Sequence, residues 1–510
     1  SYQIDNTASY SVDGNLNIMY SKTFNEKHLL SVGVGSDLQV SQSDMNGFIA
    51  TGFVSDRFDY VGAATQFLEN STPRASYDMN KLIGFFANVN YGYDDRYFID
   101  ASYRTDGSSK FGKDSRFAPF WSVGLAWNLH NEKFWNENPA HTLKIRGSIG
   151  NTGTVNFSSS QALTTYYYDT SKEYNGIYGA SLKGYGNPAL KWQNTRSYDV
   201  GFDLTLFDNR FSAYVDFYIK DTDNLLLSMD VAPSVGFSSY TENIGESRNK
   251  GWEGRFRIMW VDNKERDINW STTFAIFQNR NKITKLSNTL EALNSEAMSD
   301  DATSGRIVYR QFAEGRSQSA LMVVQSAGID PATGQEVYVK LDGTKTFTYD
   351  ASDKIMVGDM NPKAEGTITS NFNWGGFNLY LLFKYQWGGK AYNGTLASKV
   401  EGCNPRFNAD RRALEERWQK PGDDVYYTSI KNTSGPKQTT RFVFDDNLFS
   451  LQSVSASYDL PRRLAEKIGA ERIKFNVSTT DVFRLSTIKQ ERGTSYPFAW
   501  TFTAGLNVTF

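Results

Sequence analysis

Hydrophobic and polar residues alternate along much of this chain, and the last thirteen residues show the pattern most clearly. The alternate apolar positions are Phe498, Trp500, Phe502, Ala504, Leu506, Val508 and Phe510. Because successive side chains of a β-strand point to opposite faces, the segment predicts a strand with one apolar and one polar face. Strands of a bacterial outer-membrane barrel alternate in this way between lipid and lumen.

The same period-two pattern recurs about fifteen times, which predicts an all-β protein. Two of the segments are separated by Asp208, Asn209 and Arg210, where a hairpin would reverse the chain. The clearest segments are residues 16–24, 85–93, 97–103, 117–127, 143–149, 198–206, 211–219, 252–260, 270–276, 377–385, 454–460, 473–477 and the final strand.

The predicted connections alternate between short and long. The short ones are residues 25–28, 94–96, 208–210, 262–267 and 375–376, and the long ones are about 44–82, 152–194, 222–248, 279–363 and 388–446. Outer-membrane barrels have short periplasmic turns and longer extracellular loops. The pattern therefore predicts a transmembrane, antiparallel, up-and-down β-barrel with Phe510 on the periplasmic side.

The strand count and direction bear on how much of a barrel the chain represents. About fifteen strands is an odd number, whereas bacterial single-chain barrels have an even one. The first predicted strand also runs toward the short-turn side. We therefore expect residues 1–510 to be the C-terminal part of a longer barrel, unable to close or transport alone.

The amino-acid composition and net charge exclude several classes of protein. Only 39% of residues are hydrophobic, with no run long enough for a transmembrane helix, yet 15% are aromatic, as the interfacial girdles of a barrel require. A net charge of −2 gives no reason to expect nucleic acid. The single cysteine, Cys403, is interpreted as a passive loop thiol, and no metal or cofactor site is predicted.

Several local motifs stand out along the chain. They are TDGSSKFG (105–112), NPALKW (187–192), YIKDTDNLL (218–226), NIGESRNKGWE (243–253), GIDPATGQEVY (328–338), WQKPGDD (418–424) and DDNLFSLQSVSASYDLP (445–461). Together these motifs resemble the SusC/RagA family of TonB-linked outer-membrane transporters. The resemblance covers residues from about 97 to 510, and the motifs follow each other in the same order as in that family.

This resemblance implies a plugged 22-stranded barrel in a Bacteroidetes-type outer membrane, a size known for outer-membrane transporters. Its partners would be TonB and a SusD-like surface lipoprotein that closes over the mouth. The family's plug and TonB-contacting segment are absent from these residues. The longest loops, 44–82, 279–363 and 388–446, are expected to contact the lipoprotein.

The motifs also have purely structural interpretations. Gly107 and Gly112 suit tight turns, and Asn187-Pro188 suits the end of a loop. The aspartate of GIDPATG could indicate calcium, but the run lacks the closely spaced acidic residues of a calcium loop. A hairpin turn is the favoured interpretation there.

An enzyme is disfavoured, as is an adhesin or purely structural barrel. Catalytic triads usually need a histidine base, and His28, His130 and His141 are all predicted beside periplasmic turns. No pair of acidic residues stands out as a glycosidase site. The loops are larger than a plain anchor needs.

Substrate class rests on one tyrosine-rich loop. Its candidate binding residues are Tyr166, Tyr167, Tyr168, Tyr174, Tyr178 and Tyr185, which could stack on sugar rings. The same tyrosines could equally pack loops against each other. As the substrate we prefer oligosaccharides, and peptides stay open as the alternative. A siderophore or vitamin receptor is the next alternative.

The alternation also assigns faces to single residues. Leu204, Phe217, Leu381 and Phe502 are predicted to face lipid. Asp203, Asp216 and Thr503 are predicted to face the lumen.

Overall fold

The computed structural model describes residues 1–55, 57, 60–69, 71, 73–112, 115–135, 140–154, 163–187, 189–230, 239–243, 245–286, 313–404, 406–432, 435–488 and 501–510. Its main sheet has sixteen strands within these residues. One of them, β3, pairs only with the end of β2, and the other fifteen follow each other in chain order. The predicted number of about fifteen strands and their up-and-down order are therefore confirmed.

The strands of the main sheet are β1 (Tyr2–Phe24), β2 (His28–Thr51), β3 (Gln66–Phe67), β4 (Arg74–Tyr93), β5 (Tyr97–Ser108), β6 (Phe117–Asn128), β7 (Ala140–Thr154), β10 (Gln193–Leu206), β11 (Phe211–Asp223), β14 (Gly245–Asn263), β15 (Ile268–Leu286), β20 (Ala364–Trp374), β21 (Phe377–Tyr392), β22 (Val443–Asp459), β23 (Arg472–Ser486) and β24 (Thr501–Thr509). Phe498 and Trp500 of the predicted final strand lie outside the described residues.

The described residues also form three smaller sheets, which lie in the connections. They are the hairpin of β8 (Thr165–Tyr174) and β9 (Ile177–Gly184), the hairpin of β12 (Leu226–Asp230) and β13 (Ser239–Asn243), and a four-stranded sheet of β16 (Ala320–Ile329), β17 (Glu336–Val339), β18 (Lys345–Thr346) and β19 (Lys354–Asp359).

The helical elements are short: η1 (Val61–Ala63), η3 (Leu129–Asn131), η4 (Lys133–Trp135), η6 (Ala351–Asp353), η7 (Leu396–Glu401), α2 (Arg412–Glu415), η8 (Thr440–Phe442), α3 (Arg462–Ala465) and η9 (Glu466–Ile468). Within the described ranges, no helix has the length and apolar run that crossing a bilayer requires.

The chain divides into two compact units, each described here by itself. The first unit consists of Ser1–Trp127, Gly147–Tyr198 and Asp221–Ile244, and contains β1 to β6. The second consists of Asn128–Arg146, Asp199–Lys220 and Gly245–Phe510, and contains β14 to β24.

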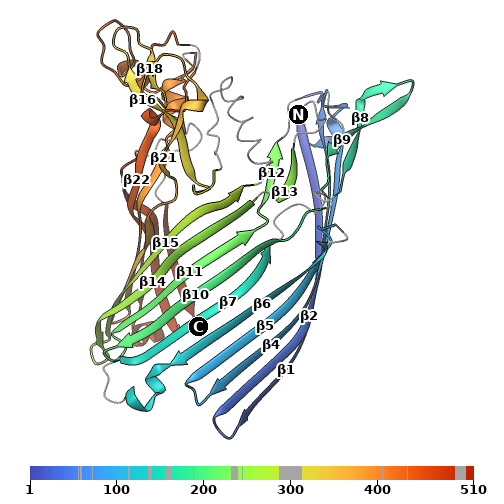
Figure 1. Cartoon of the computed structure of the whole chain (residues 1–510). Helices are drawn as coiled ribbons and strands as arrows, with labels where there is room; N and C mark the ends of the chain where they lie inside the picture. The colour runs from blue at the N-terminus through green and yellow to red at the C-terminus, as the bar shows by residue number, and fades with distance from the viewer. Residues whose placement is uncertain are drawn as a thin grey trace. The chain divides into compact units, whose positions relative to one another are not determined.

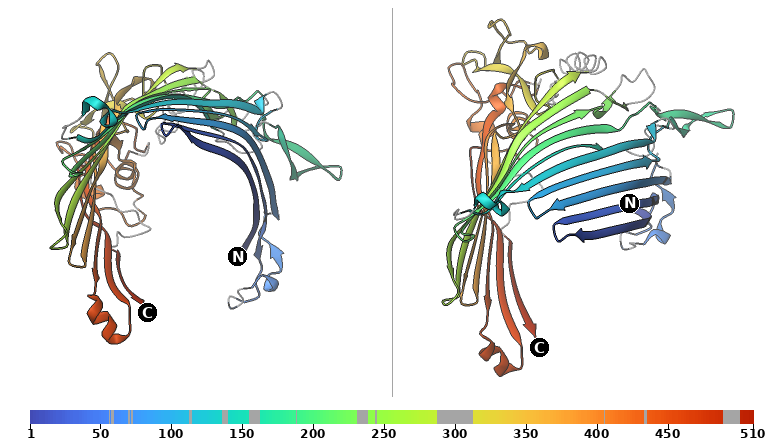
Figure 2. Two further views of the ribbon diagram at one scale, coloured as in Figure 1. Left: turned by 90° about the horizontal axis from the view of Figure 1, so that it is seen from below. Right: turned by 60° about the horizontal axis from the view of Figure 1, so that its bottom comes forward.

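In the first unit, cross-strand pairing lines apolar side chains into rows on one face of the sheet. One row runs Tyr20, Val32, Val89, Ala101 and Val123 across β1, β2, β4, β5 and β6. These strands lie side by side in Figures 1 and 2, coloured blue to cyan. A whole row of this kind forms because neighbouring strands keep one register, so each strand's alternation adds to the next.

The second unit repeats the arrangement. Phe502 pairs with Thr479, Thr479 with Val454, and Val454 with Leu381. The neighbouring Thr503 pairs with Ser478 on the opposite face. Leu381 and Phe502 therefore share the apolar face, as the alternation predicts, and their contact with lipid stays a prediction.

The predicted short turns are all present between strands. Several need left-handed backbone, which Asn, Asp and Gly adopt at the lowest cost. Asn25 has φ 48°, Asp94 has φ 54°, and Gly375 and Gly376 have φ 52° and 86°. These residues explain why the turn sites could be read from the sequence.

Strands extend into the predicted loop ranges. β1 has 23 residues and β2 has 24, whereas crossing the hydrocarbon core takes about 9–11 tilted residues. Thus β2 continues to Thr51 and β4 begins at Arg74, inside the range 44–82. Above the bilayer both faces of a strand meet water, so no apolar alternation marks these extensions.

Candidate functional site

The polar face of the main sheet carries shared ion pairs. In the second unit, Arg146 lies 3.1 Å from the Asp203 carboxylate and 2.5 Å from that of Asp216. A Cβ atom added to Gly201 would lie 2.2 Å from Asp216 Oδ1. Gly201 therefore leaves the space in which the guanidinium lies against the sheet.

Leu204 and Phe217 follow these aspartates directly, so they point to the opposite face. Phe217 is 51% exposed there. The structure therefore agrees with the prediction that Asp203 and Asp216 lie on one face of the sheet and Leu204 and Phe217 on the other. Like Leu381 and Phe502, these two residues are still untested for lipid contact.

The first unit has a matching cluster. Arg104 lies 2.6 Å from Asp37 and 2.6 Å from Asp106, on the face opposite the apolar row. Gly84 lies between the two aspartates in register, and a Cβ there would meet the Arg104 guanidinium at 2.4 Å. A polar wall of paired charges beside glycines suits the hydrated lumen of a barrel.

The candidate tyrosines lie in and beside the β8–β9 hairpin, in the first unit. The register pairs position 166 with Leu182, 167 with Ser181 and 168 with Ala180. β8 and β9 pair only with each other, and Figure 1 shows them extending beyond the strands of their unit. Tyr166 is 65% exposed and Tyr185 52% exposed. The side chains of Tyr167, Tyr168, Tyr174 and Tyr178 lie outside the described residues.

Two of the family-like motifs pack against each other in the first unit. Trp192 of NPALKW stacks on Phe111 of TDGSSKFG, with ring centroids 4.7 Å apart. Its Nε1 donates to the Ser115 carbonyl at 2.9 Å, and Leu190 is fully buried in the same cluster. This packing supports a structural interpretation of the two motifs. The predicted tight turn at Gly107 is wrong, however, because Gly107 lies within β5, paired with Ile83 and Phe117. A Cβ atom there would lie 2.4 Å from the Phe117 ring, which explains the glycine.

Asn243 of a third motif joins this cluster. Its Oδ1 accepts from the Lys191 backbone at 2.9 Å, and its Nδ2 donates to the carbonyls of Lys191 and Asn224. One amide side chain thus holds the NPALKW segment to the connection after β11.

The GIDPATG and WQKPGDD motifs make the corresponding pair in the second unit. GIDPATG forms the hairpin turn between β16 and β17, as predicted. Trp418 Nε1 donates to the Pro331 carbonyl at 2.9 Å, and Gly334 lies against the indole, where a Cβ would clash at 2.5 Å. Hydrogen bonds from Thr333 lower the pKa of the exposed Asp330 carboxyl, which keeps the turn's acceptor ionised.

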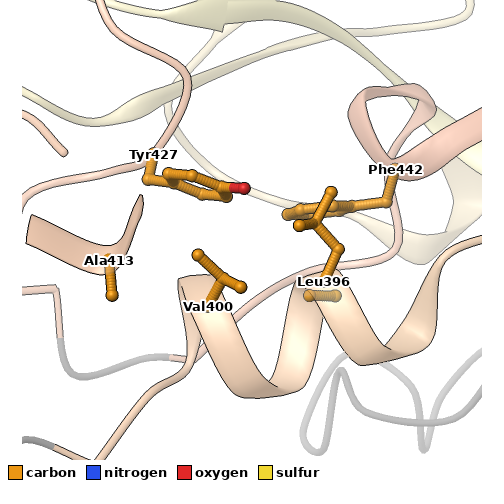
Figure 3. Packing of buried hydrophobic residues seen from close by; sticks show 6 residues of the cluster. Leu396, Val400, Ala413, Tyr427 and Phe442 are labelled. Atoms are coloured by element: carbon orange, nitrogen blue, oxygen red, sulfur yellow. The ribbon is translucent and has the colours of Figure 1, made fainter. Parts of the chain in front are cut away.

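β16 to β19, η7, α2 and η8 together form a folded region that we call the loop subdomain, residues 313–363, 393–404, 406–432 and 435–442. Figure 1 shows β16 and β18 beside the upper ends of β21 and β22. An apolar cluster of described residues lies inside it. In Figure 3, Leu396 and Val400 project from η7 toward the rings of Tyr427 and Phe442, with Ala413 alongside.

A buried ionic network lies beside this cluster. Arg441 Nη2 donates to Glu336 at 2.9 Å and Nη1 donates to Glu401 at 3.0 Å. The Arg441 side chain is only 5% exposed, and those of Glu336 and Glu401 are each 3% exposed. Burial alone would lower the pKa of Arg441, but the two carboxylates outweigh it and raise that pKa.

The sequence alone did not predict this network, because Arg441 lies 105 residues from Glu336 and 40 residues from Glu401 along the chain. No local spacing connects them. The β8–β9 hairpin, in contrast, had a readable signal: Asn175 and Gly176 form its turn with φ 50° and 77°. Asn-Gly is the strongest short-range hairpin signal.

The histidines lie beside short turns, as predicted. His28 opens β2 and bonds Tyr91 at 2.8 Å, His130 contacts the Leu143 carbonyl at 3.1 Å, and His141 lies 2.6 Å from Asp208. In the described part of the chain, no group of three or more His, Cys, Asp or Glu residues could hold a metal ion.

Comparison with known proteins shows which family this chain matches. The family described as TonB dependent receptor-like, beta-barrel, matches residues 1–477. TonB-dependent receptor P3 of Formosa agariphila is 27% identical over 97% of this chain and 52% of its own length. TonB-dependent receptor SusC of Bacteroides thetaiotaomicron is 33% identical over 41% of this chain and 21% of its own length.

Among solved structures, that of the RagAB peptide transporter matches with a TM-score of 0.86 at 23% identity, over 100% of this chain and 56% of that one. The chain spans about half the length of the curated relatives that match nearly all of it. Those relatives are receptors rather than enzymes. The chain therefore belongs to the TonB-dependent receptor β-barrel family of outer-membrane proteins and is of the SusC/RagA type.

Proposed function

We propose that the protein imports nutrient oligomers, in the first place oligosaccharides, across the outer membrane, energised by TonB and working with a SusD-like surface lipoprotein. The family match supports receptor-mediated import, and the named relative SusC supports a lipoprotein partner. The substrate and the partner of this chain are the parts that experiment must establish.

The tyrosine-rich hairpin is the observation that carries the glycan assignment. Aromatic rings with a polar tip suit sugars, because the ring face covers the apolar side of the sugar and the hydroxyl bonds its edge. Tyr166 presents such a ring, 65% exposed, at a site free of main-sheet pairing. Its neighbours at 167 and 168 continue the same strand.

Calorimetry on the transporter purified with its partner from native membranes tests this assignment. Replacing Tyr166 and Tyr168 together with Ala should weaken oligosaccharide binding by about 1 kcal/mol per ring, whereas Tyr167→Ala should change it little. Unchanged affinity for every oligosaccharide, with saturable binding of peptides, would assign the protein to peptide import instead.

The lipoprotein partner is proposed to contact the loop subdomain and the connection between β2 and β4. These segments carry folded structure well beyond what a bare barrel needs, and long loops with their own structure are usually functional. Co-purification of a surface lipoprotein with the native protein is the expected result. Full uptake by a single-component preparation would favour the siderophore or vitamin type of receptor.

A further inference from the structure

The loop subdomain contains a cavity of about 660 Å³ between η7 and the segment that follows Thr428. Ala397, Ser398, Cys403, Arg417 and Ile430 are among its lining residues. This volume falls within the range of about 300–1,000 Å³ that small-ligand pockets occupy. Its lining includes neither the ion-pair residues of the polar face nor residues of the tyrosine-rich hairpin.

A buried arginine forms part of the cavity wall. Arg417 is 6% exposed, and its guanidinium is held by backbone carbonyls. Nε donates to Ala413 at 2.8 Å, Nη1 to Thr428 at 3.0 Å, and Nη2 to Val400 at 2.8 Å and Glu401 at 2.6 Å. These bonds fix the orientation of the group. Because a guanidinium has five N–H donors, Nη1 keeps one for which the described residues supply no acceptor.

The charge of Arg417 also lacks a carboxylate partner within the described residues. Glu401 lines the same cavity, but its Oε1 accepts from the Thr428 backbone and its Oε2 from Arg441. Glu336 likewise bonds Arg441 through both oxygens. A buried charge that is not paired is costly, and an anion entering the cavity would reduce that cost.

We propose that this cavity binds a carboxylate group of the transported molecule, held by the remaining Nη1–H of Arg417. A planar guanidinium is well suited to a carboxylate, and the apolar Ala397 and Ile430 would cover the adjoining part of the ligand. The carboxylate could be the C-terminus of a short peptide or the uronic acid of an oligosaccharide. This inference rests on the proposed import function and narrows its substrate class to acidic oligomers.

Cys403 offers a direct test, because it lines the cavity, is partly exposed and is the single cysteine of these 510 residues. Its labelling by a thiol reagent would be followed by mass spectrometry on the native complex. The four probes are a short peptide, its C-terminal amide, a uronate oligosaccharide and its neutral counterpart. A ligand at ten times its Kd leaves about one tenth of sites open, so labelling should slow roughly tenfold.

Protection by an acid but not by its uncharged counterpart supports the proposal, and the protecting acid identifies the source of the carboxylate. Equal protection by both members of a pair would overturn it, as would protection by none of the four. If none protects while oligosaccharides are still taken up, the cavity assignment fails and the import function stands.

Two variants on η7 separate the cavity from its surroundings. Ser398 and Lys399 are both exposed neighbours on η7, but only Ser398 lines the cavity. Ser398→Trp should place its indole in the cavity and abolish protection by the acidic ligand, whereas Lys399→Trp should retain that protection. The same protection in both variants would place the carboxylate elsewhere.

Discussion

The buried Arg441 network should decide the stability of the loop subdomain. Arg441→Met removes a guanidinium that pairs with Glu336 and Glu401, all with side chains at most 5% exposed. Two carboxylates would then lie buried without a counter-charge. Removing one partner of a buried pair costs about 3–5 kcal/mol, so local opening should become roughly 150- to 4,000-fold more frequent.

Hydrogen exchange of the β16 and β17 amides measures this opening. Exchange there should accelerate in Arg441→Met, while amides of β23 keep their rates because the barrel strands do not depend on the network. Arg411→Met is the matched control, since the Arg411–Glu415 pair is exposed at 84% and 49% and contributes little. Equal exchange in the two variants would refute the role assigned to the buried network.

Charge removal distinguishes the electrostatic cause from lost packing. Glu336→Gln combined with Arg441→Met leaves one buried carboxylate rather than two, so it should restore part of the protection. Additive losses in the double variant would show that packing, not the unpaired charge, causes the effect.

Further predictions concern the sheet and one buried tyrosine. Leu381→Arg should cost about 2–4 kcal/mol if it lies at the bilayer midplane, whereas Tyr380→Arg on the polar face should cost much less in refolding titrations. Gly201→Ala should cost about 1–3 kcal/mol by displacing the Arg146 ion pair, and Gly14→Ala, whose nearest neighbour is 3.9 Å away, should be tolerated. Burial, with the charge of a neighbouring carboxylate, raises the pKa of Tyr338, so the native state keeps its proton above the unfolded pKa near 10. The loop subdomain should therefore lose stability as pH rises beyond about 10, and less so in Tyr338→Phe.

The sequence predicts the membrane-spanning part of the fold well, because the two faces of each strand meet different media. Leu381 and Phe502 could be assigned to one face from alternation alone, and their register confirms it. The turns at Asn25 and Gly375 were readable because left-handed backbone selects a few residue types.

The extracellular part was less predictable for a physical reason. There, strands such as the end of β2 meet water on both sides, and the packing depends on contacts distant in sequence. Arg441 and Glu336 are 105 residues apart, and the Arg417 cavity joins η7 to a segment beyond Thr428. The tyrosines were found by their density, and only the structure shows that they lie in and beside a separate hairpin.

Uptake by whole cells tests the central claim most directly. Labelled oligosaccharides and labelled peptides would be offered to cells that carry or lack the gene, with and without collapse of the proton-motive force that energises TonB. We predict that deletion abolishes energy-dependent oligosaccharide uptake, that the intact gene restores it, and that peptide uptake is unchanged. Loss of peptide uptake with oligosaccharide uptake intact would contradict the account.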